Sequence, residues 1–220
     1  MNESIFVVEN VNGYVSIGTG ANGVKTGLKV WDAHKKLIIP SVIDGQKIEE
    51  ISKYAFYTYK YVEEVIISDG IKTIRTYAFG HCENLVNVII APSVERLESY
   101  SIHCYNHSYH SSVSDDASSS IFTTKGVLTI TFLPNSNLKY LADFSICRRE
   151  NIVIYFLGYS SPETQGDPFN TKYLKSLVIY SPYIKVFGGY NVKGIVYSCK
   201  VNCSKSFNSF LMNVLIIIIN

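Results

Sequence analysis

The sequence predicts a β-rich solenoid, a fold in which one structural unit is copied along the chain and the copies stack. The first observation is a repeat of 23 residues, because residues 51–56 (ISKYAF) return at 74–79 (IRTYAF) and more weakly at 97–102 (LESYSI). The second is that residues 62–67 (VEEVII) return at 85–90 (LVNVII) with the same spacing. Two phrases in constant register indicate a tandem supersecondary unit, which must stack on its neighbours to bury its apolar face.

The composition supports a folded chain without a strongly charged surface. Hydrophobic residues make up 47% of the 220 residues, charged residues only 17%, and the net charge is +2. Acidic and basic residues are interspersed, so the sequence carries no basic patch of the kind that binds nucleic acid or an anionic membrane. We therefore expect neither as a partner.

Residues 1–35 lack the repeat and are predicted to cap its first unit. Two β-rich segments, residues 6–10 and 14–17, flank Asn12 and Gly13. Asn-Gly is the pair preferred in the two-residue turn of a β-hairpin. Because a solenoid needs an atypical end unit to cover its first core layer, we expect an N-terminal β-hairpin cap.

The repeat array is predicted over residues 36–199. Its first unit begins with the strand at 36–40 and contains a tight turn at Asp44-Gly45. The second and third units end near residue 106, and residues 106–123, rich in Ser, Asn and Asp, predict a polar insert. Beyond it, we expect a loop at 160–170 and strands at 128–132, 152–156, 174–179 and 195–197.

The two ends of the chain bear on its location. No secretory signal is visible at the N-terminus. The C-terminal tail, residues 200–220, contains an apolar run at 210–219 that is shorter than the roughly 20 residues a membrane-spanning helix needs. We expect the tail to dock on the solenoid as a last strand or apolar end; a membrane-proximal remnant and an aberrant terminus are the alternatives.

The cysteines do not form a disulfide framework, because they are odd in number and scattered. We expect them to be buried free thiols that act as small hydrophobic residues, and a Cys199–Cys203 bridge has no support in the sequence. The five are Cys82, Cys104, Cys147, Cys199 and Cys203.

The strand phrase separates inward from outward positions. Its first, fourth and sixth residues, Val62, Val65 and Ile67 in one copy, are expected to face the core. The residues between them face outward and form the candidate binding surface, which consists of Ile38, Glu63, Glu64, Ile66, Val86, Asn87, Ile89, Lys175, Ser176 and Val178. We expect Ile38, Ile66, Ile89 and Val178 to share one column, which is either a protein-binding stripe or a consequence of strand propensity alone.

The repeat resembles a known family. Its consensus is Leu-x-x-Val-x-Ile, a turn, and Ile-x-x-x-Ala-Phe-x-x-Cys-x-x-Leu, best seen at residues 65–85. This pattern is similar to the BspA-type leucine-rich repeat, strongly over 37–105 and more weakly over 127–199. The phrases FLPNS at 132–136 and DPFN at 167–170 resemble the large protozoan branch of that family. The resemblance implies a right-handed leucine-rich-repeat array with one parallel strand per repeat, in a surface or secreted adhesin-like protein.

Other motifs are weak. His103, His107 and His110 have spacing that could gather zinc on a helical turn, with His81, Cys82 and Cys104 nearby in sequence. The segment is rich in Ser and Asn, and no second ligand pair has motif spacing, so we predict no metal and no cofactor. Adjacent acids, Glu49-Glu50, Glu63-Glu64 and Asp115-Asp116, are interpreted as solvated.

Two further kinds of motif bear on function. Among three N-glycosylation acceptors, Asn2, Asn106 and Asn202, we expect only Asn106, in the polar insert, to be well placed. No phosphate-binding loop, nucleophile elbow or metalloprotease helix occurs, so the sequence predicts that the protein is not an enzyme.

The sequence therefore predicts non-catalytic protein recognition. The leading interpretation is a cell-surface or extracellular adhesin-like protein whose partners are proteins of host cells, matrix or other microbes, with no membrane-spanning segment. The alternative is an intracellular, cytoplasmic leucine-rich-repeat scaffold, which the absent signal peptide and free thiols favour. A third hypothesis, a decayed relative without a ligand, is favoured by the broken period. The oligomeric state is left open.

Overall fold

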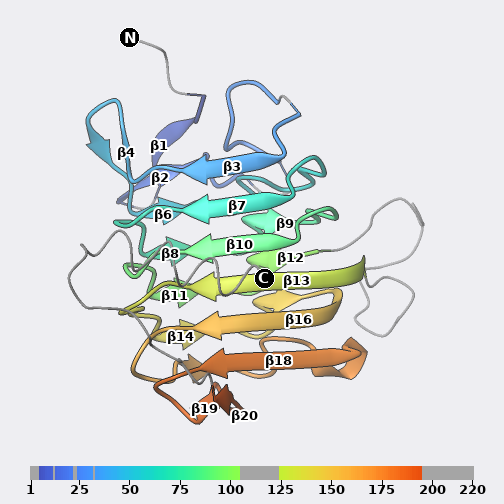
Figure 1. Cartoon of the computed structure of the whole chain (residues 1–220). Coiled ribbons are helices and arrows are strands. Elements are labelled where there is room, and N and C mark those ends of the chain that lie inside the picture. The colour runs from blue at the N-terminus through green and yellow to red at the C-terminus, as the bar shows by residue number, and fades with distance from the viewer. Residues whose placement is uncertain (1–4, 12, 22–23, 32, 105–123, 195–220) are drawn as a thin grey trace, which may run out of the picture.

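Two seven-stranded sheets line the solenoid in the computed structural model, which describes residues 5–11, 13–21, 24–31, 33–104 and 124–194 (Figure 1). The sheet that we call the long sheet consists entirely of parallel strands. In spatial order its strands are β3 (Lys36–Ile39), β7 (Glu64–Ile67), β10 (Asn87–Ile90), β13 (Thr124–Phe132), β16 (Arg149–Phe156), β18 (Ser176–Ser181) and β21 (Lys193–Gly194). One parallel strand per repeat confirms the predicted β-solenoid.

The opposite sheet, called the short sheet, is built from shorter strands, and a third, three-stranded sheet lies at the corner between them. The short sheet contains β1 (Val8–Val11), β2 (Tyr14–Ile17), β6 (Glu50–Ile51), β8 (Thr73–Ile74), β11 (Arg96–Leu97), β14 (Tyr140–Leu141) and β17 (Glu163–Thr164). The corner sheet contains β9 (Phe79–Gly80), β12 (Ile102–His103) and β15 (Ile146–Cys147). Strand β17 corrects the expectation that 160–170 is entirely loop.

The N-terminal segment forms the predicted hairpin cap. Strands β1 and β2 pair antiparallel, and β2 then pairs in parallel with β6, so the cap continues the short sheet. Phe6 packs edge-on against Phe56 of the first repeat, with ring centroids 6.4 Å apart. The division into a cap, an array and a tail remains a prediction, because the insert at 106–123 and the segment 195–220 lie outside the described residues.

Two small hairpins complete the β structure. Strands β4 (Val42–Ile43) and β5 (Gln46–Lys47) pair antiparallel around Asp44 and Gly45, whose φ angles are 50° and 80°. Positive φ at both central residues is what a type I′ turn requires, and the predicted tight turn is thereby confirmed. At the other end of the solenoid, β19 (Val186–Phe187) pairs with β20 (Tyr190–Asn191), after the 3-10 helix η3 (Thr171–Tyr173).

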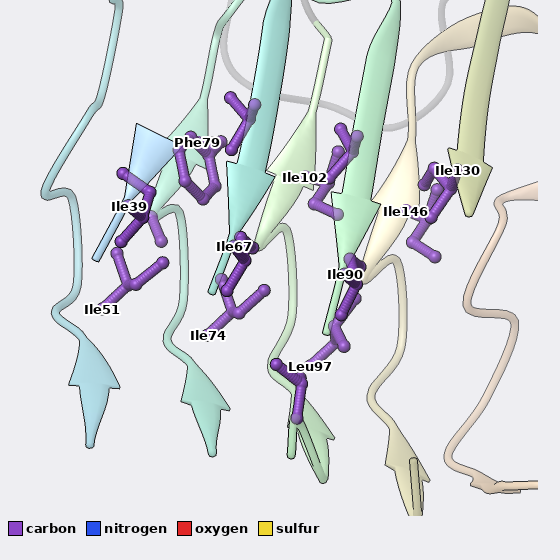
Figure 2. Close-up of a cluster of buried hydrophobic side chains, with 14 of the residues drawn as sticks. Ile39, Ile51, Ile67, Ile74, Phe79, Ile90, Leu97, Ile102, Ile130 and Ile146 are labelled. Atoms are coloured by element: carbon purple, nitrogen blue, oxygen red, sulfur yellow. The ribbon is translucent and has the colours of Figure 1, made fainter. Parts of the chain in front are cut away.

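The core is a set of aliphatic columns between the two main sheets (Figure 2). Ile39, Ile67 and Ile90 lie in register on the long sheet, and each is almost fully buried. They pack toward Ile51, Ile74 and Leu97, which lie in register on the short sheet. Because burial of such a side chain contributes roughly 1.5–3 kcal/mol, each stacked turn adds to the stability of its neighbours.

A ladder of aromatic residues marks the corner of each turn. Tyr54, Tyr77, Tyr100 and Phe144 all have left-handed backbone conformations, with φ between 54° and 58°. Tyr54 stacks on Tyr77 at 5.3 Å, and Tyr77 stacks on Tyr100 at 4.7 Å. A positive φ is uncommon for residues other than glycine, and stacking of this kind contributes about 0.5–1.5 kcal/mol per pair. The stacked rings therefore offset the backbone strain of the corner.

The described cysteines behave as predicted. Cys82, Cys104 and Cys147 form no disulfide with one another, and all three are fully buried. Burial raises the pKa of all three thiols above the ordinary value, which keeps them protonated and chemically inert. Cys199 and Cys203 lie outside the described residues.

Asp167 is expected to make the C-terminal turns sensitive to acid. Burial alone would raise the pKa of its carboxyl, but hydrogen bonds from Thr171, Tyr190 and the Phe169 N–H outweigh burial and lower it. A carboxyl with a lowered folded-state pKa stabilises the fold above its unfolded pKa of about 3.9, and this stability is lost as the pH falls through the folded value. Urea midpoints at pH 7 and pH 3 should therefore differ less in Asp167→Asn than in the wild type.

The matched control is Asp44→Asn, in the exposed β4–β5 turn, where Asn is also favoured at positive φ. This variant should keep the wild-type difference between the two pH values. An unchanged difference in Asp167→Asn would contradict the assignment.

Candidate functional site on the outward face of the long sheet

One uncharged column runs along the outward face of the long sheet. We call it the uncharged column; its members, in register from β3 to β18, are Ile38, Ile66, Ile89, Thr131, Tyr155 and Tyr180. Ile38 is 54% exposed, most of the others are half-buried, and Thr131 is buried. The Tyr155 and Tyr180 rings stack 5.3 Å apart, and partial burial, followed by the neighbouring Tyr180, raises the pKa of Tyr155.

The neighbouring outward column, which we call the charged column, has charged residues at its N-terminal end. It contains Lys36, Glu64, Asn87, Thr129, Val153 and Val178. The ammonium of Lys36 lies 2.5 Å from a Glu64 carboxylate oxygen, and the amide of Asn87 donates to the other at 3.2 Å. These polar side chains satisfy one another across adjacent turns.

The structure corrects the expected position of Val178. This residue was predicted in the same column as Ile38, Ile66 and Ile89, but it lies in the charged column beside them. On the core side, Ile179 consequently lies level with Val88 rather than Ile90, and the small residue Ser181 occupies the level of Ile90. The large rings of Phe156 and Phe187, 4.8 Å apart, fill the core beside it. A shift of two residues keeps Val178 facing outward.

The remaining predicted residues flank the two columns. Glu63 forms an ion pair with Lys35 at 2.8 Å, and this hydrogen bond raises the pKa of Lys35. Lys175 forms an ion pair with Glu150 at 3.0 Å. The Ser176 hydroxyl donates to Asn151, and Val86 lies exposed just before β10. Exposed pairs of this kind contribute little to stability, so they act mainly as a polar border.

Tyr155 and Tyr180 are site residues that the sequence prediction missed. The signal was present, since both alternate with buried residues in their strands. They were overlooked because the repeat phrase was aligned by its leucines, which placed Val178, not Tyr180, beside Ile89.

Two of the histidines considered as zinc ligands in the sequence lie in the core. His81 and His103 are buried among Tyr57, Tyr77 and Tyr100, with 5.0 Å between their ring centroids. Burial, followed by the charges of His81 and Arg148, lowers the pKa of His103 well below its ordinary value. Within the described residues no group of three or more His, Cys, Asp or Glu side chains is placed to hold a metal ion. His107, His110 and the acceptor Asn106 lie outside those residues.

A family model agrees with the 23-residue repeat. A family model described as "BspA type Leucine rich repeat region (6 copies)" matches residues 33–153, more than half of the chain. A similar solved structure is titled "Crystal structure of T. pallidum Leucine Rich Repeat protein (TpLRR)"; it has 14% sequence identity and a TM-score of 0.43, over 87% of this chain and 91% of that chain. No curated protein matches. In the part of the chain that the structure describes, no helix has the length and apolarity to cross a membrane.

Proposed function

Because the chain belongs to the BspA-type leucine-rich repeat family, we propose that it is a non-catalytic adhesin-like protein, exposed at the cell surface or secreted. Its partners would be proteins of host cells, matrix or other microbes. Membership of this family indicates a protein-interaction module in general, and the adhesin-like role is the more specific proposal. The observation that carries the proposal for this chain is the uncharged column on the outward face of the long sheet.

The chemistry of the column suits a protein partner. The centres of protein interfaces are depleted in charged residues and enriched in aromatic ones, while their rims are polar. The column has aliphatic Ile38, Ile66 and Ile89 at one end and stacked Tyr155 and Tyr180 at the other, bordered by ion pairs. At about 4.8 Å per strand it extends for about 24 Å, and a rigid sheet loses little conformational entropy on binding.

A second function, an intracellular interaction scaffold, is supported by one observation. Cys82, Cys104 and Cys147 form no disulfide with one another, and cysteines without disulfides are typical of proteins in a reducing compartment. The scaffold would use the same uncharged column, so the two functions differ in location and partner.

Replacing Ile66 and Ile89 together with threonine is expected to weaken partner binding on the order of tenfold, because two apolar contacts are lost. Threonine keeps the β-branched shape, and both side chains face outward, so the midpoint of urea unfolding should change little. The measurement is binding of the purified protein to cultured host cells and to immobilised matrix proteins. Val186→Thr, which makes the same kind of change at an exposed site on β19, is the matched control.

Unaltered binding by the double variant would remove the uncharged column as the recognition surface. Absence of saturable binding by the wild-type protein to cells and matrix would count against the adhesin-like function and favour the scaffold.

A further inference from the structure

A groove of about 460 Å³ lies on the outward face of the short sheet, on the opposite side of the solenoid from the uncharged column. It crosses β6, β8, β11 and β14, and the rings of Tyr14 and Tyr140 contribute to its lining. Its volume falls in the range of about 300–1,000 Å³ that small-molecule sites occupy. The lining contains no aliphatic side chain; it consists of charged residues, one threonine and two tyrosines.

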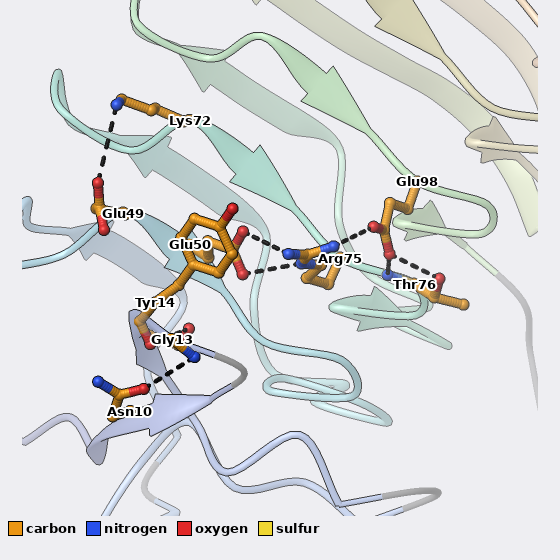
Figure 3. A network of polar contacts seen from close by, with 10 residues as sticks. Asn10, Gly13, Tyr14, Glu49, Glu50, Lys72, Arg75, Thr76 and Glu98 are labelled. Carbon is orange, nitrogen blue, oxygen red and sulfur yellow. Dashed lines mark hydrogen bonds and ion pairs between the residues drawn. The ribbon is translucent and has the colours of Figure 1, made fainter.

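A fixed ion network forms part of the groove wall (Figure 3). The Arg75 guanidinium donates two hydrogen bonds to the buried Glu50 carboxylate, at 2.5 and 2.8 Å, and one to Glu98 at 2.7 Å. Glu98 also accepts from the backbone N–H and the hydroxyl of Thr76. The Tyr14 ring lies over the same guanidinium, whose carbon is 5.8 Å from the centroid of that ring. These contacts hold the wall in place before any ligand arrives.

One basic side chain of the groove lining has no carboxylate partner among the described residues. Each carboxylate in the lining has a basic partner: Glu49 pairs with Lys72 at 3.8 Å, Glu50 with Arg75 at 2.5 Å and Glu95 with Lys139 at 2.9 Å. One cation, Arg96, remains. Within the described residues Arg96 forms no ion pair and its guanidinium donates no hydrogen bond to a protein acceptor, so its donors stay available to a ligand, although Glu98 on Arg75 makes the groove neutral as a whole.

Arg96 is also held in position. Its guanidinium carbon lies 4.1 Å from the centroid of the Tyr140 ring, a cation–π contact that restrains the side chain. The Tyr140 hydroxyl in turn donates to Gln165 of the next turn. A guanidinium with unused donors in a fork geometry is matched to a carboxylate, which it binds through two parallel hydrogen bonds.

From this arrangement we propose that the groove binds an acidic sugar, whose carboxylate is held by Arg96. The sugar class is favoured over an acidic peptide because peptides are recognised through apolar anchor pockets, a free strand edge or a cluster of arginines, whereas the groove lining has no apolar pocket and Arg75 is already taken by Glu50 and Glu98, which leaves Arg96 alone. The hydroxyl groups of a sugar both donate and accept, and the wall matches them with carboxylates that accept and ammonium groups that donate. This site is separate from the surface proposed for protein partners.

The test is isothermal titration of the full chain with an oligosaccharide of glucuronic acid, beside a neutral glucose oligosaccharide of the same length. The acidic sugar should bind and the neutral one should not. Arg96→Gln should weaken binding on the order of tenfold or more, because a charge-assisted contact is lost. Lys47→Gln, which removes one positive charge from the exposed β4–β5 hairpin, should bind as the wild type does. Equal urea midpoints for both variants would establish that each is folded.

Three outcomes would overturn the proposal. The first is that the wild type does not bind the acidic sugar, and the second is that Lys47→Gln loses as much affinity as Arg96→Gln. The third is that a polyglutamate peptide binds in an Arg96-dependent manner while the sugar does not, which would assign the groove to a peptide.

Discussion

Replacing Phe79 with alanine is expected to lower the free energy of unfolding by about 3–5 kcal/mol, the usual cost of deleting a buried phenyl ring. Phe79 is fully buried and stacks on Phe56 of the preceding turn, with ring centroids 5.1 Å apart and planes 6° apart. Because a solenoid is stabilised through contacts between neighbouring turns, a cavity in a central turn weakens its contacts on both sides. Urea unfolding followed by circular dichroism would measure the loss.

Two further variants serve as controls for the effect of Phe79→Ala. Phe79→Leu keeps most of the volume and should cost clearly less than the alanine variant. Val30→Ala, at a side chain that is 70% exposed, should remain within about 0.5 kcal/mol of the wild type. If Phe79→Ala lowered the free energy of unfolding no more than Val30→Ala does, the described packing of Phe79 on Phe56 would be contradicted.

The second large effect is expected for Glu50→Gln, which should cost about 2–3 kcal/mol. The Glu50 side chain is almost fully buried, and the hydrogen bonds that it and Glu98 accept from Arg75 raise the pKa of Arg75. Removing one partner of a buried ion pair costs about 3–5 kcal/mol. The expected value is smaller here, because Arg75 is about a third exposed to screening solvent and keeps Glu98 as a partner.

The control for this variant lies in the same column of the short sheet. Glu163 occupies the position in β17 that Glu50 occupies in β6, but it is exposed. Glu163→Gln should therefore change the urea midpoint little. If Glu50→Gln were no more destabilising than Glu163→Gln, the network of Figure 3 would have no role in stability.

The inward positions could be predicted from the sequence because a strand has a period of two. Val65, Ile67, Val88 and Ile90 were expected to face the core, and all four are buried. In the repeated phrase at 51–56 and 74–79, Phe56 and Phe79 are fully buried and stack on each other. These features depend only on local alternation and on the constant repeat of the early units.

The register of the later strands could not be predicted in the same way. Ile130, Ile154 and Ile179 lie side by side in the sheet but are 24 and then 25 residues apart, so the repeat of 23 residues no longer applies. Aligning similar letters then placed Val178 in the wrong column. In these strands the large rings of Phe132 and Phe156 fill the core at the level of Ile90, a packing arrangement that the pattern of a single repeat does not reveal.

The groove was missed because its chemistry depends on pairing between turns. Glu49 and Glu50 were interpreted as solvated, which is wrong for Glu50, since Arg75 covers it from the next turn. The unpaired state of Arg96 becomes visible only when the neighbouring carboxylates are seen to have other partners. Residues one turn apart are spatial neighbours in this fold, so charge pairing should be sought between neighbouring turns, as in Glu49–Lys72 and Glu50–Arg75.

The most direct test of the proposed adhesin-like function is protease treatment of intact cells, with the protein followed by immunoblot beside a cytosolic control protein. The proposal predicts that the protein is lost while the cytosolic protein is spared, because a surface-exposed module is accessible to the protease. Protection of both proteins would contradict surface exposure and direct the search for partners to the interior of the cell.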